Sequence, residues 1–398
     1  MFLDLIRRRN PMLIEQSIAL HQTGKLPANT YVIDLDAVEN NARHIANVAG
    51  KFGLKTYAMT KQMGRNGSFC RAVVKGGIAK AVAVDMECAR ATRRAGMGLG
   101  HIGHLVQVPR FEADAAASFA PDHWTVFSLD KAKEAGEAAH RLGRTQAILA
   151  RLVAEGDRFY RGQEGGLPAG DVLSVADAID AMPGARFAGI TTFPSQLFEH
   201  ASAKVMPTPN LATLERAAEA LAKAGRTGIE INAPGTTSAE ILPMLASAGA
   251  TQIEPGHGLT GTTPLHAVQD LPEIPAVVYL SEVSHSIGGE AFCFGGGLYI
   301  DPVFPDYSVR AIVAREPTVS ETALAKVDIP APASIDYYGM IDASGAVQPR
   351  CGDSVVFGFR PQAFVTRAYV AGVSGLSHRN PVVETIYDAL GHPADWPV

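Results

Sequence analysis

Two segments rich in glycine and hydroxyl residues could hold an anion. Residues 232–238 read NAPGTTS and residues 254–258 read EPGHG, each after an apolar run typical of a strand. Turns of this kind expose backbone N–H groups, which bind phosphate together with the start of the following helix. In a barrel of alternating strands and helices, the loops after the last two strands commonly hold phosphate. The pair predicts a phosphate site, with ordinary turns and Ser/Thr helix caps as the alternative interpretation.

A lysine and a glutamate lie at the ends of predicted strands. Lys61 ends a strand whose mostly apolar run is 57–59, and Glu254 opens the second glycine segment. A lysine at the end of a barrel strand is partly desolvated, which lowers its pKa and suits it to Schiff-base chemistry. Taken alone, each residue is also explained as a solvated charge. Together with a phosphate clamp, they are the groups that pyridoxal phosphate (PLP) requires: an amine for its aldehyde and an acid for its ring nitrogen.

The elements that must position these residues alternate regularly along the first two thirds of the chain. Candidate strands open at Thr56, Ala79, Gly103, Trp124, Ala147, Phe187, Gly228 and Ala250. They stand about 28 residues apart, as repeated strand–helix units do. Residues 130–143 predict a helix that begins at a capping Asp130 and ends at Gly143, and 210–225 follow the same pattern. We predict an α/β fold with a (β/α)8 TIM-type barrel; a doubly wound open sheet shares the local pattern.

The pattern changes after Pro264. Helix signals fade, and runs within 276–301 and 353–373 indicate antiparallel strands joined by Gly and Pro turns. We therefore predict a smaller, mostly antiparallel β domain over 266–398, after a barrel over 31–265 and a helical lead over 1–30. Residues 1–27 are expected to form one helix, and 31–49 a strand and helix that enter the barrel.

Composition excludes several classes of protein. The 398 residues are 47% hydrophobic and 19% charged, with a formal net charge of −5 and no dense basic run, so we expect no nucleic-acid partner. Four cysteines lie far apart without the spacing of a metal site or a disulfide scaffold. No window reaches the roughly 18 apolar residues of a membrane span, and charge enters before a signal-peptide core forms. We expect a cytoplasmic protein that binds no membrane.

The sequence resembles the alanine-racemase-like (fold type III) PLP enzymes, and among them the YhfX-type branch. The resemblance spans almost the whole chain through YVIDLDAVENNARHI, YAMTKQMGRN, AVAVDMECARATRRAG, GHIGHLVQVP, GQEGG, KVMPTPNL, NAPGTTS, EPGHGLTGT and CFGGGLY. It implies an N-terminal barrel, a C-terminal β domain, PLP as the cofactor and a homodimer with shared active sites. It also implies that Lys61 forms the Schiff base with the cofactor, and that the phosphate is held by Gly235, Thr236, Thr237, Gly256 and His257.

The same resemblance places Glu254 beside the ring nitrogen. Alanine racemases have an arginine at this position, whereas basic amino-acid decarboxylases of this fold have a glutamate in a similar E-P-G-R segment. A carboxylate partner favours a protonated ring, which makes a wider set of reactions at the α-carbon accessible.

Three segments depart from the family pattern. Thr192, in the segment TTFP, stands where many relatives stack a histidine on the cofactor. Arg161, just before GQEGG, is a weak match to the arginine near the phenolic oxygen, and a solvated loop arginine is the alternative. Residues 361–365 (PQAFV) replace the P-x-H-x-C metal ligands of aldolase and dehydratase relatives. We therefore expect no metal site of that kind, and metal-assisted cleavage or dehydration ranks lower.

Racemisation needs a second proton carrier, which in this family comes from the partner subunit's C-terminal domain. The candidates are Cys293, His285, Tyr337 and Tyr338. The alternatives are a small buried cysteine and a structural histidine at a strand end. His101 and His104 have no third ligand at metal spacing, so we interpret them as structural or substrate-facing.

We predict a PLP-dependent racemase or epimerase of a small amino acid or related amine, which acts by deprotonation of the α-carbon through the Lys61 Schiff base. The enzymatic alternative is decarboxylation or metal-free elimination. A non-catalytic PLP carrier is a further alternative, but a carrier needs no second domain. A barrel that binds another phosphorylated metabolite, with Lys61 as a phosphate contact, is the last alternative.

Overall fold

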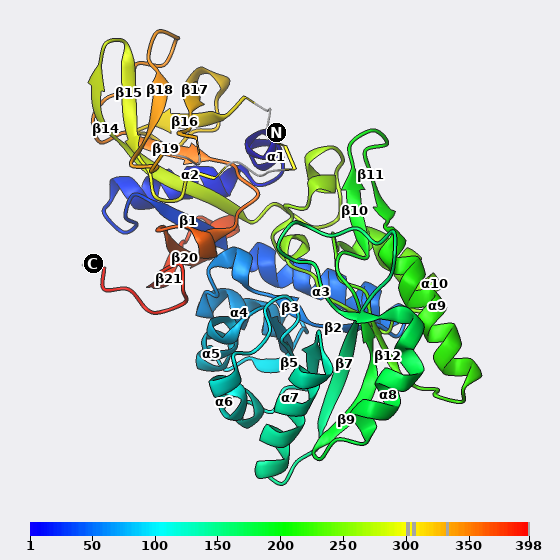
Figure 1. The fold of residues 1–398 in the computed structure, drawn as a ribbon. Coiled ribbons are helices and arrows are strands. Elements are labelled where there is room, and N and C mark those ends of the chain that lie inside the picture. The colour runs from blue at the N-terminus through cyan, green and yellow to red at the C-terminus, as the bar shows by residue number, and fades with distance from the viewer. Residues whose placement is uncertain (300–302, 305–307, 332–333, 397–398) are drawn as a thin grey trace. The chain divides into compact units, whose positions relative to one another are not determined.

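The computed structural model describes residues 1–299, 303–304, 308–331 and 334–396, which fold into two compact units (Figure 1). The first unit comprises Met1–Asn41, Lys61–Gly76 and Leu259–Val398, and the second comprises Ala42–Thr60 and Gly77–Gly258. Each unit is thus assembled from separate stretches of the chain. The first contains an antiparallel sheet and the second a barrel. None of the described helices is both long and apolar enough to cross a membrane.

The second unit is a closed parallel barrel. Strands pair in chain order from β3 through β4, β5, β6, β7, β9 and β12 to β13, and β13 pairs in parallel with β2. Only Tyr57 separates β2 from β3, so these two count as one strand and close the ring of eight. This confirms the predicted TIM-type barrel over the open sheet. The strands are β2 Lys55–Thr56, β3 Ala58–Met59, β4 Lys80–Ala83, β5 Gly98–Ile102, β6 His123–Val126, β7 Gln146–Val153, β9 Ala185–Thr191, β12 Glu230–Asn232 and β13 Gln252–Ile253.

Helices between the strands cover the outside of the barrel (Figure 1). They include α5 Met86–Arg94, α6 Ala113–Ser118, α7 Leu129–Arg141, α8 Val172–Asp180, α9 Pro209–Lys223 and α10 Leu242–Ser247, while α3 Leu35–Lys51 runs from the first unit into the second. The cap of α7 is Ser128, which accepts a hydrogen bond from the Lys131 N–H at 3.3 Å. The expected cap, Asp130, lies instead in the first turn, where its charge complements the helix dipole.

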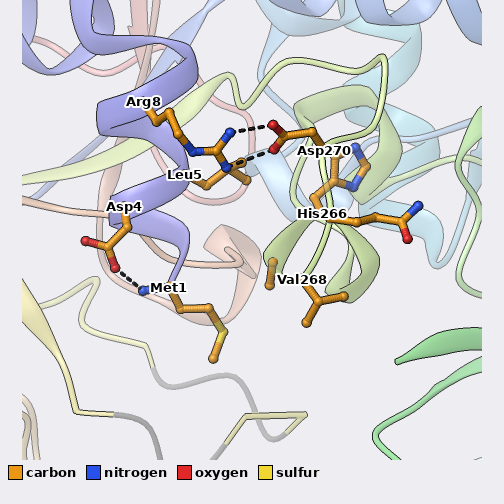
Figure 2. Close-up of a pocket in the computed structure, with 9 residues that line it drawn as sticks. Met1, Asp4, Leu5, Arg8, His266, Val268 and Asp270 are labelled. Carbon is orange, nitrogen blue, oxygen red and sulfur yellow. Dashed lines mark hydrogen bonds and ion pairs between the residues drawn. The ribbon is translucent and has the colours of Figure 1, made fainter. Parts of the chain in front are cut away.

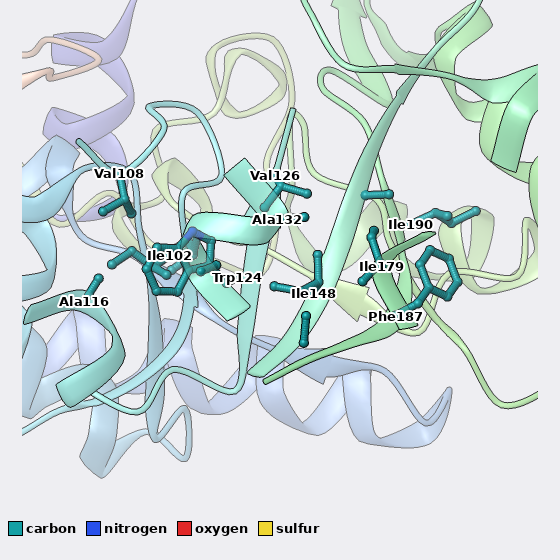
Figure 3. Close-up of a cluster of buried hydrophobic side chains, with 14 of the residues drawn as sticks. Ile102, Val108, Ala116, Trp124, Val126, Ala132, Ile148, Ile179, Phe187 and Ile190 are labelled. Atoms are coloured by element: carbon teal, nitrogen blue, oxygen red, sulfur yellow. The ribbon is translucent and has the colours of Figure 1, made fainter. Parts of the chain in front are cut away.

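An apolar layer joins the helices to the strands. Along β7, Ile148, Ala150 and Leu152 belong to a buried cluster that also contains Ala132 of α7 and Ile179 of α8 (Figure 3). Side chains on a strand alternate between its two faces, so the residues between these three point into the barrel.

Seven of the eight predicted strand starts fall within two residues of the first residue of an observed strand, but the strand expected from Gly103 is wrong. The strand there is β5, which ends at Ile102. Gly103 has φ +76° and a Cβ at this position would lie 2.6 Å from the Thr125 carbonyl oxygen. This left-handed turn ends the pairing, and the apolar residues that follow lie in a loop.

The first unit contains a sheet in the order β15-β18-β17-β16-β19-β14-β1-β20-β21, antiparallel except where β1 pairs with β20. It confirms the predicted mostly antiparallel β domain. Its strands among the described residues are β1 Thr30–Asp34, β14 Val277–Ile287, β15 Glu290–Phe294, β16 Arg310–Ala314, β17 Leu324–Asp328, β18 Tyr338–Asp342, β19 Ser354–Phe357, β20 Tyr369–Ser374 and β21 Val382–Tyr387. Helices α1 Phe2–Arg9, α2 Pro11–Gln22 and α4 Gly67–Lys75 belong to the same unit.

Two expectations near the N-terminus are wrong. The predicted single helix over 1–27 is two helices, α1 and α2, because Pro11 has no N–H to donate to a preceding turn and begins a new helix at its first position. The strand within 31–49 does not enter the barrel. It is β1, whose five residues are all buried between β14 and β20. Tyr31 packs against Tyr279 of β14 with ring centroids 5.2 Å apart, which ties it to the sheet.

Candidate functional site

Polar side chains line the interior of the barrel. Barrel interiors of this fold are usually filled by branched aliphatic residues. Here the buried inward positions carry His101, His123, Thr125, Arg151, Thr191, Asn232, Gln252 and Glu254. Because burying polar groups costs free energy unless they are paired, this interior is the first place to look for function.

Glu254 follows β13 and is held in a buried network. Its side chain is 1% exposed, and Asn232 Nδ2 donates a hydrogen bond to its Oε1 at 2.8 Å. Asn232 donates in turn to Thr191 Oγ1 at 3.1 Å, and His104 Nε2 lies 3.1 Å from Glu254 Oε2. Burial raises the pKa of Glu254 to about 8, and the Asn232 hydrogen bond offsets only part of this effect. Without a cationic ligand beside it, the side chain is therefore mostly protonated at pH 7.

His101 lies close to Glu254 inside the barrel, with its Nδ1 3.6 Å from Glu254 Oε1. His101 Nε2 is 2.7 Å from Gln252 Oε1, and the His101 ring packs against Tyr57 and His123 with centroids 4.7 and 5.2 Å away. Burial, and then the neighbouring His123, lower the pKa of His101 to about 3, so this ring is neutral. His101 is fully buried among these neighbours. The approach of His104 to Glu254 could not be read from the H-I-G-H spacing, because it depends on β5 and β13 facing each other across the barrel.

The loops after β9, β12 and β13 join at one end of the barrel. The Ser195 N–H donates to the Pro234 carbonyl at 2.8 Å, and the Thr236 N–H donates to the Gln196 carbonyl at 3.1 Å. A Cβ on Gly235 would lie 2.5 Å from that Gln196 oxygen, so only glycine fits. A Cβ on Gly258 would likewise lie 2.5 Å from the Thr237 carbonyl, which shows how closely the β13 loop approaches the β12 loop.

These joined loops contain buried hydroxyls suited to an anion. Ser195 Oγ and Ser238 Oγ are buried and have no hydrogen-bond partner among the described residues. Buried hydroxyls left without partners are rare in folded proteins. Phosphate oxygens would satisfy them, so the residues present fit the phosphate of PLP. Ser238 ends the NAPGTTS segment already predicted to face an anion, whereas the sequence does not single out Ser195, whose role arises only when the β9 loop reaches the β12 loop.

The predicted phosphate residues fall on these loops. Gly235, Thr236 and Thr237 lie on the β12 loop with the contacts above, and Gln196 Nε2 donates to Thr237 Oγ1 at 3.4 Å. Gly256 and His257 lie on the β13 loop, where the buried His257 begins a short 3-10 helix. Thr192 is buried on the β9 loop and accepts a hydrogen bond from Asn210 Nδ2 at 3.4 Å.

Lys61 begins a 3-10 turn in the first unit, where its Nζ lies 4.9 Å from the centre of the Phe364 ring. Phe364 belongs to the apolar stretch 361–365. Two residues before Lys61, in the second unit, the Met59 N–H donates to the Pro255 carbonyl at 2.9 Å. The strand that leads into Lys61 is therefore hydrogen-bonded to the residue directly after Glu254.

The candidates for a second proton carrier do not share one environment. Cys293 is fully buried, and burial raises the pKa of its thiol to about 11, so this position does not favour proton exchange. His285 is exposed, stacks on Phe292 with centroids 4.7 Å apart, and meets the edge of Tyr338 at 5.2 Å. The exposed Tyr337 ring lies 5.9 Å from the guanidinium of Arg367. His285 and Tyr338 thus share an aromatic face that Cys293 does not reach.

The two arginines near the predicted site differ in exposure. Arg161 has a 97% exposed side chain, which pairs with Glu164 at 3.3 Å, as the solvated alternative holds. Arg151 on β7 is fully buried and points into the barrel. A single arginine inside the apolar run AILARLV was the available signal, and sequence reasoning passed over it.

A separate cavity of about 520 Å³ lies in the first unit (Figure 2). It is lined by Met1, Asp4, Leu5, Arg8 and residues 266–270, and Arg8 bonds both oxygens of Asp270 at 2.5 and 2.8 Å. No predicted site residue lines it. Throughout the described ranges, no three His, Cys, Asp or Glu side chains are placed to hold a metal ion.

Comparisons with known proteins agree with the fold. A model of the alanine racemase N-terminal domain matches residues 33–264, and a model of the YhfX-like C-terminal domain matches 278–383. The chain is 39% identical over 394 residues to the uncharacterized protein YhfX of Escherichia coli K12, covering 98% of this chain and 99% of that protein.

The solved structures with this fold include an aldolase, a dehydratase and a racemase. D-threonine aldolase from Filomicrobium marinum is 18% identical with a TM-score of 0.69, covering 92% of this chain and 96% of its own. D-threo-3-hydroxyaspartate dehydratase from Delftia sp. HT23 is 15% identical with a TM-score of 0.66, covering 92% and 98%. Alanine racemase from Clostridium difficile 630 is 13% identical with a TM-score of 0.62, covering 92% and 99%. At these identities the likeness shows a common fold.

Proposed function

We propose that this protein is a PLP-dependent enzyme that moves the α-proton of a small amino acid or related amine. The chain belongs to the alanine racemase N-terminal domain family and to its YhfX-like branch. The first reaction we propose is racemisation or epimerisation, in a homodimer with shared active sites. The observation that carries the proposal is the joined loop cluster, with its buried, unpartnered Ser195 and Ser238 hydroxyls at the barrel end where Glu254 lies.

Different residues would hold different parts of the cofactor. When bound, PLP supplies an aldehyde that condenses with amines and a ring that stabilises negative charge at the α-carbon. Ser195, Ser238 and the Gly235–Thr237 backbone would hold its phosphate. Glu254 would meet the ring nitrogen, where a cationic partner would favour the carboxylate over the buried acid.

Two side chains are proposed to carry protons, one on each face of the substrate. Lys61 is proposed to accept the α-proton at Nζ and to return it to the same face. His285 of the partner subunit is proposed to serve the opposite face, because its imidazole is exposed and an imidazole can both accept and donate a proton. The buried Cys293 is the weaker proposal for this role.

A second reaction class is favoured by Glu254 itself. Its buried carboxyl group is suited to keeping the cofactor ring protonated, and a protonated ring stabilises charge enough for decarboxylation or elimination as well as proton exchange. The alanine racemase resemblance supports the first class and this residue supports the second.

One experiment separates these functions. Purified protein loaded with PLP is incubated in deuterium oxide with a panel of D- and L-amino acids, amino-phosphates and amino-phosphonates, and followed by mass spectrometry and chiral chromatography. Racemisation gives α-deuterium in both enantiomers, which a Lys61→Ala variant should abolish. Loss of carbon dioxide, or of a β-substituent, selects the second class. Protein that binds PLP but neither exchanges α-hydrogen nor releases carbon dioxide or a β-substituent across the panel contradicts both classes, and leaves the PLP carrier.

A further inference from the structure

Arg151 lies at the inner face of β7, near the barrel end that carries the functional loops. Its register partner on β9 is Thr191, which bonds Asn232 next to Glu254. Its neighbours Ala150 and Leu152 face outward into the apolar layer. Arg151 is therefore on the same face as the Glu254 network, with β9 lying between its strand and β12, which carries Asn232.

Two carbonyls and two aromatic rings hold the guanidinium in place. Nη2 donates to the Gln163 carbonyl at 2.6 Å and to the Phe193 carbonyl at 3.4 Å. The Phe127 and Phe159 rings lie 4.4 and 5.6 Å from Cζ. The side chain is thus anchored by one nitrogen before any ligand arrives, so little conformational freedom remains to be lost on binding.

The charge of Arg151 is not neutralised by the protein. The side chain is 0% exposed, and Nε and Nη1 have no hydrogen-bond partner among the residues that the structure places. No acidic side chain in those ranges lies within ion-pair distance of it, and burial alone lowers the pKa of the guanidinium to about 10. A buried cation without a counter-charge is strongly unfavourable, whereas guanidinium is well suited to bind carboxylate and other oxyanions.

We infer that Arg151 is a preformed receptor for an oxyanion of the molecule bound in the barrel, and that this oxyanion is the α-carboxylate of the substrate. The choice of carboxylate rests on the proposed function. In the proposed function the loops after β9, β12 and β13 bind the cofactor phosphate. Arg151 lies on a different strand, β7, and so remains for another oxyanion. A substrate receptor on β7 would select amino acids over simple amines.

The first test uses the protein without cofactor. Thermal unfolding is measured in sodium acetate and in sodium chloride at equal ionic strength, for wild type, Arg151→Met and Arg151→Lys. Acetate should raise the Tm of wild type above its value in chloride, and this difference should disappear in Arg151→Met. Arg161→Met is the matched control, because the same substitution at a 97% exposed arginine should leave the acetate effect unchanged.

The second test uses PLP-loaded protein and compares glycine with methylamine, which differ only in the carboxylate. Spectral titration should show at least a tenfold loss of glycine affinity in Arg151→Met, with methylamine affinity unchanged. If PLP affinity itself falls tenfold and the glycine-to-methylamine ratio stays constant, the receptor serves a cofactor oxyanion, which overturns the substrate assignment. Should Arg151→Met fail to fold, Arg151→Lys must lower the same ratio several-fold.

The outcomes distinguish this inference from the proposed function. If the wild type binds PLP and Arg151→Met has the same affinities in every titration, the inference about Arg151 is overturned and the proposed function is not. Wild type that binds no PLP overturns the proposed function, while an acetate effect lost in Arg151→Met still supports an oxyanion receptor.

Discussion

The two faces of the barrel strands have opposite characters. Outward residues such as Ile148 and Trp124 form a continuous apolar layer with the helices (Figure 3). Inward residues such as Arg151, Asn232 and Glu254 are polar and buried, and several of their atoms lack partners among the described residues. The outer layer contributes most of the favourable burial, so the interior can retain groups that cost stability. In this barrel, the alternation of side chains along each strand places the stabilising residues on the outer face and the candidate functional residues on the inner face.

The largest expected effect is on the outer layer. Ile148→Ala removes a fully buried side chain between β7 and the helices, and should lower the free energy of unfolding by about 2–5 kcal/mol. Phe111→Ala is the control, since that ring is 96% exposed and its loss should change stability by about 0.5 kcal/mol or less. Urea unfolding followed by circular dichroism gives both values. Equal effects at the two positions would contradict the stabilising role of this layer.

The second largest expected effect is a pH dependence of the folding stability that arises from Glu254. Its pKa is raised to about 8 in the folded protein, so between its unfolded pKa and 8 the unfolded state has lost a proton that the folded state keeps. Stability contributed by the protonated acid is therefore present at pH 4.5 and below, and is lost as pH rises toward 8. Each pKa unit corresponds to about 1.4 kcal/mol, so the loss amounts to a few kcal/mol.

Glu254→Gln tests this dependence without changing the size of the side chain. The wild type without cofactor should lose stability from pH 5 to pH 8, and the glutamine variant should lose much less. Saturating PLP should reduce the wild-type loss, because a cationic ring would stabilise the carboxylate. Identical pH profiles for the two proteins would mean that Glu254 is not the buried acid described above.

The smallest expected effect on stability accompanies a clear effect on binding. Ser195→Ala and Ser238→Ala each remove a buried hydroxyl without a described partner, so the unfolding free energy should stay within about 1 kcal/mol of wild type. PLP affinity should fall about tenfold for each, the equivalent of one lost hydrogen bond of about 1.4 kcal/mol. Thr208→Ala is a useful contrast, since its hydroxyl donates to the Pro194 carbonyl at 2.6 Å and should affect stability first. Unchanged PLP affinity in both serine variants would show that this loop cluster does not bind the phosphate.

Local patterns were enough to predict the barrel and the antiparallel sheet. Strand runs, helix stops and glycine turns are local properties, and the resemblance drew attention to Lys61, Glu254 and the two glycine-rich loops. The failures share one cause, which is that they depend on neighbours distant in the chain. Arg151 looks like part of an apolar strand until its register with Thr191 is known, and the 31–49 strand looks like a barrel strand until its pairing with β14 is seen.

The most direct test of the whole account locates the amine that carries PLP. Protein loaded with PLP is reduced with borohydride, digested and mapped by mass spectrometry, with Lys61→Ala treated in parallel. We expect a single pyridoxyl-modified peptide that contains Lys61 in the wild type, and its loss in the variant. Stoichiometric modification of another lysine, or equal labelling of the variant, would contradict it.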